Sequence, residues 1–159
     1  MAPSVHAQAF TVEFIRTASL EKHELFKHAV VWVMESFGSA RPFIRVQNEQ
    51  LGTIIGRGAF DINIGGDILL NKPVTYELRI VVRNNRYRLT FSDVELPSEG
   101  IPRSINYSDR GTDERQAHEY FEQLVDSLAK HLAAASEYEA AYRARMSEPC
   151  RPSLILESC

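Results

Sequence analysis

Six arginines are the residues of this chain best suited to binding chemistry, because strand alternation sends all of them to one face of a predicted sheet. They are Arg45, Arg57, Arg79, Arg83, Arg86 and Arg88. Guanidinium groups bind carboxylate or phosphate through paired hydrogen bonds. Three acids, Glu13, Asp61 and Glu77, alternate outward with them, so the face has an excess of positive charge. It is either a binding surface for an anionic ligand or a solvated face whose arginines pair with carboxylates across strands.

The histidines and carboxylates form no catalytic or metal-binding set. The segment from His23 to His28 has the residue types of a zinc metalloprotease helix, but that site needs histidines four residues apart. A spacing of five turns the second histidine away by about 140°, so we expect both to be solvated. The aspartates are spread over strands and loops with no accompanying histidine pattern. The sequence therefore predicts no catalytic residues, no metal and no cofactor.

Two glycines, Gly56 and Gly58, lie in the middle of a predicted strand, on its apolar face. They are not a phosphate-binding loop, because such loops place their glycines in the turn before a helix. Positions without a side chain in a buried sheet face allow a large ring or a helix to lie directly on the backbone. We predict that the ring of Trp32 lies there.

The hydrophobic periodicity predicts strands at 10–15, 43–47, 52–64 and 74–82, a returning strand through Tyr87, Leu89 and Phe91, and helices at 20–37 and 112–146. Ser19 is the expected N-cap of the first helix. Asn84 and Asn85 should form a type I′ turn, which requires positive φ angles. In the second strand, Ile44 and Val46 should face inward, and Phe43, at the end of the strand, outward. The predicted fold is an antiparallel sheet with two helices on one face, an α+β sandwich of two layers.

The last helix is longer than the sheet that it should cover. A helix over 112–146 extends about 50 Å, whereas a strand of ten residues extends about 33 Å. Its end, with Tyr138 and Tyr142, should project and could meet a second copy of the chain. The segment 136–139 matches a capping box, so a break near Ala134 is the alternative to one continuous helix.

Length and composition indicate one domain, residues 10–146, without special chemistry. The chain has 159 residues and a net charge of −3, with an isoelectric point near 6.0. This acidic balance gives no reason to expect nucleic acid as a partner. No apolar run approaches the roughly 20 residues of a transmembrane helix.

Both ends of the chain bear on its location. Residues 1–9 are expected to be a disordered leader or the remnant of a signal peptide, because small residues there resemble a cleavage site. Residues 147–159 form a tail that contains Cys150 and Cys159. These could form a disulfide in an oxidising compartment, remain free in the cytoplasm, or pair with another chain.

Three stretches of sequence carry a family resemblance. They are Leu25-Phe-x-x-Ala29-x-x-Trp32, Gln47-x-Glu49-x-x-Gly52-x-Ile54-Ile-Gly-Arg-Gly58, and Tyr76-x-Leu78-x-Ile80 followed by Asn84-Asn-Arg-Tyr-Arg88. Together they resemble an uncharacterised bacterial domain family with a TBP-like fold, similar to one repeat of the TATA-box-binding protein. The resemblance extends from Phe10 to Glu95 and implies the order β-α-β-β-β-β-α. It also implies export from a Gram-negative bacterium, but it implies no functional residues.

The sequence thus favours a non-enzymatic binding or interaction domain, exported or associated with the cell envelope. It would use the arginine-bearing sheet face, the long C-terminal helix, or both, with an unknown protein or a second copy as partner. The alternative is a binder of a small anionic ligand or of nucleic acid on the same sheet face. Nucleic acid is disfavoured because the strand aromatics point inward, apart from Phe43. An enzyme of unknown class is the third hypothesis.

Overall fold

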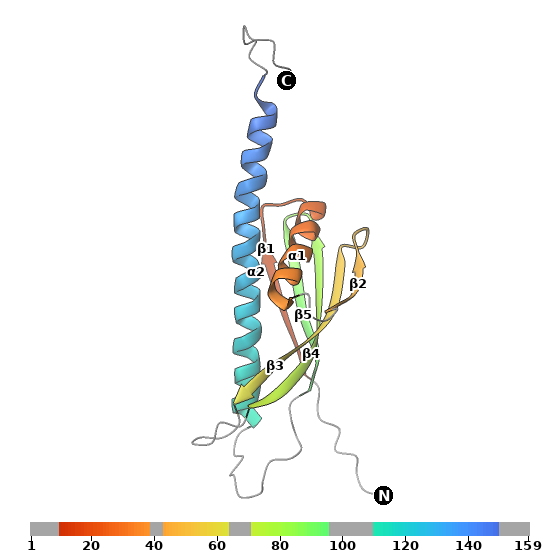
Figure 1. The fold of residues 1–159 in the computed structure, drawn as a ribbon, viewed down its shortest axis with the longest axis vertical. Coiled ribbons are helices and arrows are strands. Elements are labelled where there is room, and N and C mark those ends of the chain that lie inside the picture. Colours follow the sequence, from red (N-terminus) through yellow and green to blue (C-terminus); the bar gives the residue numbers. More distant parts are fainter. Residues whose placement is uncertain (1–9, 39–42, 64–70, 96–109, 150–159) are drawn as a thin grey trace, which may run out of the picture.

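In the part of the chain that the structure describes, five strands and two helices form the fold, in the predicted order β-α-β-β-β-β-α (Figure 1). The computed structural model describes residues 10–38, 43–63, 71–95 and 110–149. The elements are β1 (Phe10–Thr17), α1 (Lys22–Phe37), β2 (Ile44–Asn48), β3 (Thr53–Asn63), β4 (Asn71–Arg83), β5 (Arg86–Glu95) and α2 (Arg110–Ser147). The strands form one antiparallel sheet in the order β1-β5-β4-β3-β2. This arrangement confirms the predicted α+β class.

Both helices lie on one face of the sheet, as predicted (Figure 1). No other described element covers the opposite face, which we call the open face. α2 runs for 38 residues without a break near Ala134. It begins at Arg110, two residues before the expected start. One long helix therefore spans the whole length of the sheet.

The last turns of α2 project beyond the sheet (Figure 1). Tyr138 and Tyr142 are exposed there, as the length of the helix predicts. Ser136 does not cap a helix. Its hydroxyl donates a hydrogen bond of 3.1 Å to the carbonyl oxygen of Ser19, in the loop before α1. This loop contact fixes α2 just below its projecting end.

The core lies between the sheet and the two helices and follows the predicted alternation. Its buried members include Val74, Tyr76, Leu78, Ile80, Val82, Tyr87, Leu89, Phe91, Phe121, Leu128 and Leu132. Phe91 stacks on Phe121, with ring centroids 4.2 Å apart. Phe60 stacks on Tyr120 at 3.9 Å. These rings occupy the space between the sheet and α2, and their dispersion contacts join the two layers.

Rings do cover the two glycines of β3, but the prediction that Trp32 supplies them is wrong. A methyl group on Gly56 would collide with the ring of Phe43 and come within 2.7 Å of its carbonyl oxygen. One on Gly58 would lie 2.5 Å from the ring of Tyr76. Trp32 points instead toward α2, where its indole N–H donates a hydrogen bond of 3.1 Å to the Ser127 hydroxyl.

The predicted orientation of β2 is correct for Ile44, which pairs with Gly56 and packs against the core, but it is wrong for Val46 because the strand contains a bulge. The pairing with β3 shifts between Ile44 and Val46, so two residues of β2 match one of β3. A shift of one residue exchanges the two faces of a strand. Val46 therefore lies on the open face opposite Ile55, whereas Phe43 is buried and stacks on Phe37 at 3.9 Å.

Two local predictions about turns and caps are also wrong. α1 begins at Lys22, with Glu21 as N-cap rather than Ser19, and the backbone N–H of Glu21 donates to the carboxylate of Glu24. In the β4–β5 turn only Asn85 has a positive φ, of 62°. A type I′ turn needs positive φ at both central residues. Asn84 instead uses its side chain, which accepts a hydrogen bond from the Lys22 N–H.

Two predictions concern residues outside the described part of the chain. These are the leader or signal-peptide remnant at 1–9 and the possible disulfide between Cys150 and Cys159. Within the described part, no helix is both long enough and apolar enough to cross a membrane.

Candidate binding site on the open sheet face

The register of the sheet places the predicted arginines relative to one another. Arg83 and Arg86 are partners across β4 and β5, next to the turn. Arg88 lies two residues further along β5, opposite Val81 of β4 and Ile15 of β1. All three arginines are exposed. Because paired residues of antiparallel strands point to the same face, the three cations and the two aliphatic side chains share the open face.

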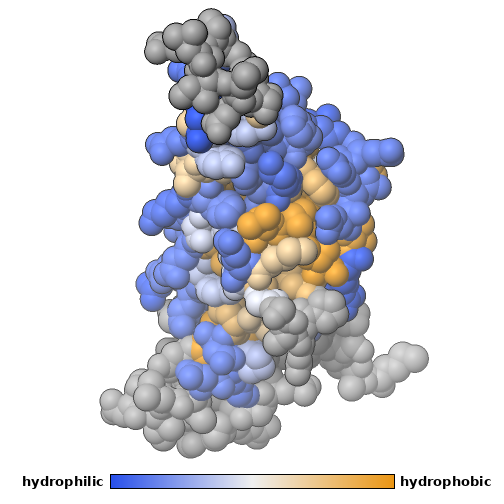
Figure 2. Space-filling view, turned by 45° about the horizontal axis from the view of Figure 1, so that its top comes forward, coloured by the Kyte–Doolittle hydropathy of each residue, from blue (hydrophilic) through white to orange (hydrophobic). Residues whose placement is uncertain are grey.

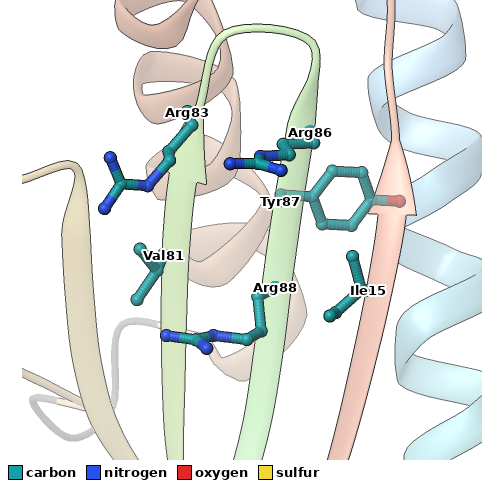
Figure 3. Close-up of a pocket in the computed structure, with 6 residues that line it drawn as sticks. All are labelled: Ile15, Val81, Arg83, Arg86, Tyr87 and Arg88. Atoms are coloured by element: carbon teal, nitrogen blue, oxygen red, sulfur yellow. The ribbon is translucent and has the colours of Figure 1, made fainter.

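A shallow hollow of about 250 Å³ lies at this place, lined by Ile15, Val81, Arg83, Arg86, Tyr87 and Arg88. We call it the arginine hollow. In Figure 3 the three guanidinium groups extend to the same side, around the side chain of Val81. Tyr87 contributes from the buried face, where burial raises its pKa. The site therefore combines three permanent cations with an aliphatic floor.

The cations of the hollow are incompletely paired. Arg88 lies 3.8 Å from a carboxylate oxygen of Glu13, with both side chains about half exposed. Among the described residues, no carboxylate lies within 4.0 Å of Arg83 or Arg86. A solvated face built on cross-strand ion pairs would show such partners. Two neighbouring guanidinium groups without acids repel each other and favour the binding of an anion.

The turn that carries Arg83 and Arg86 is fixed by the loop before α1. The Ala18 N–H donates to the Asn85 carbonyl at 3.1 Å, and the Asn85 N–H donates to the Leu20 carbonyl at 3.0 Å. A second hollow adjoins this turn and shares the two arginines, with Lys22 and Leu51 among its other lining residues. The arginines thus stand on a rigid support, which lowers the entropy cost of binding.

The other three predicted arginines lie outside the hollow. Arg79 is two residues before Val81 on the same face of β4. Arg57 is the cross-strand partner of Glu77. Arg45 is at the bulge of β2, on the far edge of the sheet from β1. All three are exposed. The structure therefore groups Arg83, Arg86 and Arg88 in the hollow, places Arg79 next to it along β4, and separates Arg45 and Arg57 from it.

A second charged cluster, which sequence reasoning missed, joins α1 to the upper part of α2. Its members are Glu24, Lys27 and His28 of α1 with Glu139 and Arg143 of α2, and we call it the α1–α2 junction. Glu139 lies 3.1 Å from Lys27 Nζ and 3.0 Å from His28 Nε2. His28 is thus not solvated as predicted. A signal existed, because Glu139 continues the buried stripe through Leu128, Leu132 and Ala135.

The junction carboxylates are stabilised in their charged form. Hydrogen bonds from His28 and then from Lys27 lower the pKa of Glu139. Burial alone would raise the pKa of Glu24, but hydrogen bonds from Arg143 and from the Glu21 N–H outweigh it, and the pKa is lowered. Charges that are this well paired stabilise the folded state and leave no free group for a ligand.

Other polar and apolar features offer no reactive set. Among the described residues, no group of three His, Cys, Asp or Glu side chains is arranged to hold a metal ion. The Tyr76 hydroxyl and an Asp113 oxygen are buried without hydrogen-bond partners in the described part, and burial raises the pKa of both groups. Figure 2 shows an apolar area on one face of the molecule. On α1, Val31 and Met34 are exposed.

The chain is similar to proteins with the same fold. Over residues 12–96 its sequence matches the family described as a domain of unknown function (DUF4468) with TBP-like fold. A TBP-like protein from Parabacteroides distasonis has a similar structure, with a TM-score of 0.54 and 14% identity over 76% of this chain and 93% of that one. A DUF4468 family protein from Bacteroides ovatus gives a TM-score of 0.50 and 15% identity over 91% and 89%. No curated protein matches the chain by sequence.

Proposed function

The chain belongs to the DUF4468 family of TBP-like domains, and we propose that it is a non-catalytic binding domain that holds an anionic partner in the arginine hollow. The family prescribes no activity, so the proposal is based on the geometry of this chain. It also retains the predicted role of the open sheet face and narrows it to one end of β1, β5 and β4.

One observation supports the proposal above all others. Arg83 and Arg86 lie side by side on a rigid turn, without a described carboxylate within 4.0 Å. In the α1–α2 junction, by contrast, the carboxylates of Glu139 and Glu24 are paired with cations of the facing helix. Guanidinium groups bind a carboxylate or phosphate in a bidentate manner. A pair of unneutralised guanidinium groups on a turn with a fixed backbone, beside an aliphatic floor, is therefore suited to holding an anion.

The experiment measures binding of a fluorescein-labelled hexaglutamate peptide to the full chain by anisotropy. The double variant Arg83→Gln with Arg86→Gln removes both charges of the turn. The double variant Arg45→Gln with Arg57→Gln is its matched control, because it removes the same charge from the same sheet.

We expect the turn variant to weaken binding about tenfold, since it loses two charge-assisted contacts. The control should change it less than about twofold, because the removed charges are distant and screened. Binding should also weaken as salt increases. Equal losses in the two variants would mean nonspecific attraction and would overturn the proposal. Failure of the peptide to bind the unchanged protein would do so as well.

A second candidate function, self-association, is favoured by the projecting end of α2. Tyr138, Tyr142 and Met146 are exposed there at intervals of four residues, which places them along one side of the helix. Sedimentation velocity of the full chain tests it. If Tyr142→Glu with Met146→Glu leaves the distribution of species unchanged at every concentration, this candidate is wrong.

A further inference from the structure

The aliphatic part of the arginine hollow carries information about the ligand that the cations alone do not. Ile15 is 59% exposed on the edge strand β1, and Val81 is partly exposed at the centre of the hollow. A free phosphate has no apolar group that could pack against these two side chains. Their exposure to water costs free energy that an apolar partner group would recover.

The register surrounds Val81 with arginines on three sides. Along β4 its neighbours on the open face are Arg79 and Arg83, and across the sheet it lies opposite Arg88 of β5. The fourth neighbour is Thr53 of β3. An aliphatic side chain is thus flanked by cations along its own strand and on the side of β5.

The spacing of this pattern matches an extended peptide. Residues two apart on a strand are about 6.7 Å apart and point to the same face. Arg79, Val81 and Arg83 therefore form a cation–aliphatic–cation series with the pitch of a strand. An extended segment on the open face repeats this pitch when its residues i, i+2 and i+4 face the sheet. Carboxylates at i and i+4 of such a segment would then lie at Arg79 and Arg83, and an aliphatic residue at i+2 would lie at Val81.

The same face is unsuited to the other anionic macromolecules. Single-stranded nucleic acid is held by aromatic stacking in addition to cations. The strongly exposed large apolar residues on the described strands are Ile15 and Val46, both of them aliphatic. An anionic membrane presents its charge as a flat surface, so it would attract all the arginines of the open face alike. Its binding would not depend on an aliphatic residue at position 81.

We infer that the arginine hollow takes an extended acidic segment of a protein with the pattern carboxylate–x–aliphatic–x–carboxylate. The aliphatic residue would pack on Val81, and the carboxylates would bind Arg83 and Arg79, with Arg86 and Arg88 beside them. This inference rests on the proposed function, because it names the class of partner for the same site.

Two labelled peptides of identical composition test the inference on the full chain. One contains Glu-Thr-Val-Thr-Glu, in which acids and valine face the same way when the peptide is extended. The other contains Thr-Glu-Val-Glu-Thr, in which the acids face away from the valine. Their charge and hydrophobicity are equal, so only the spacing differs. We expect the first to bind about fivefold more tightly, the value of one well-buried aliphatic contact.

Val81→Thr should abolish this preference, because it keeps the branched shape and removes the apolar contact. The second variant is Ile15→Thr, on the edge strand. It should reduce the affinity for the first peptide less than Val81→Thr does. Neither removes a charge. If both peptides bind equally and Val81→Thr has no effect, while Arg83→Gln with Arg86→Gln still weakens binding, the inference fails and the proposed function stands.

Two further outcomes concern other ligands. If the arginine variant has no effect on any probe, the proposed function fails together with the inference. If pyrophosphate, a single-stranded oligonucleotide or phosphatidylglycerol vesicles bind in an Arg83-dependent manner while neither peptide binds, the hollow recognises an anion of another class. That result would overturn the inference.

Discussion

Charged side chains of the α1–α2 junction, on the helical side of this sheet, are paired, whereas those of its open face are partly unpaired among the described residues. On the side of the helices, the α1–α2 junction pairs Glu24 with Arg143 and Glu139 with Lys27, each a cation of the facing helix, and both carboxylate residues are buried. On the open face, Arg83 and Arg86 are exposed and have no acidic partner within 4.0 Å in the described part of the chain. The first arrangement is explained by stability and the second is not, which directs attention to the open face as the site of function.

The inner face should be far less tolerant of added volume than the open face. Gly56→Ala places a methyl group against the ring and the carbonyl oxygen of Phe43, so we expect a loss of about 3 kcal/mol in the free energy of unfolding. Ala59→Leu adds more volume to an exposed position of the same strand and should change it by less than about 0.5 kcal/mol. Urea denaturation measures both. Similar losses would show that the two faces do not differ in packing.

The paired carboxylates of the junction should make stability depend on acid. The pKa values of Glu24 and Glu139 are lowered in the folded protein from the ordinary value of 4.5. Between the lowered and ordinary values the unfolded chain binds more protons, so stability rises with pH there. The contribution of the two groups is complete above about pH 4.5 and is lost as the pH falls through the folded-state values.

The double variant Glu24→Gln with Glu139→Gln should therefore lose stability at neutral pH and show a shallower decline in acid. Urea unfolding midpoints between neutral and strongly acidic pH measure the difference between the two curves. If the curves of the variant and the unchanged protein run parallel, the junction does not stabilise the fold through charge.

The smallest change in the free energy of unfolding is expected for substitutions of the arginines on the open face. Arg83→Gln with Arg86→Gln should leave the free energy of unfolding within about 0.5 kcal/mol, or raise it slightly, because like charges no longer face each other across the strands. This result would separate their role in binding from any role in folding. A loss above about 1 kcal/mol in urea denaturation would mean that the arginines stabilise the sheet and would remove the contrast between the faces.

Most of the fold was predictable because periodicity reports burial directly. The alternation from Val74 to Val82 and the apolar stripe of α2 gave the correct elements and order. The errors arose where a single extra residue changes which way a strand's side chains point, or where a side chain distant in sequence helps to fix the start of a helix. The bulge in β2 placed Val46 on the open face, and no local sequence pattern predicts a bulge. Phe43, just before the strand, is buried because it stacks on Phe37 of α1. The first turn of α1 is held in part by Asn84, whose side chain accepts a hydrogen bond from the Lys22 N–H, 62 residues away.

For the candidate site, the sequence could predict which face of the sheet carries the arginines, but only in part which of them lie together. Alternation sent the six arginines outward, and the predicted two-residue turn implies that Arg83 faces Arg86. It could not tell that Arg88 lies between Val81 and Ile15 or that Arg45 is at the opposite edge. Pairing partners are a property of the tertiary structure. For the same reason the sequence could not show that Glu13 lies near Arg88, whereas Arg83 and Arg86 have no described acid beside them.

The most direct test of the central claim is a map of the binding surface. Amide chemical shifts of the isotope-labelled full chain would be followed by NMR as the Glu-Thr-Val-Thr-Glu peptide is added. We expect the largest changes on β4, the β4–β5 turn and the facing part of β1, at residues 79–90 and 13–17. Changes centred on α1 or on the projecting end of α2 would contradict the claim that the open face binds the partner.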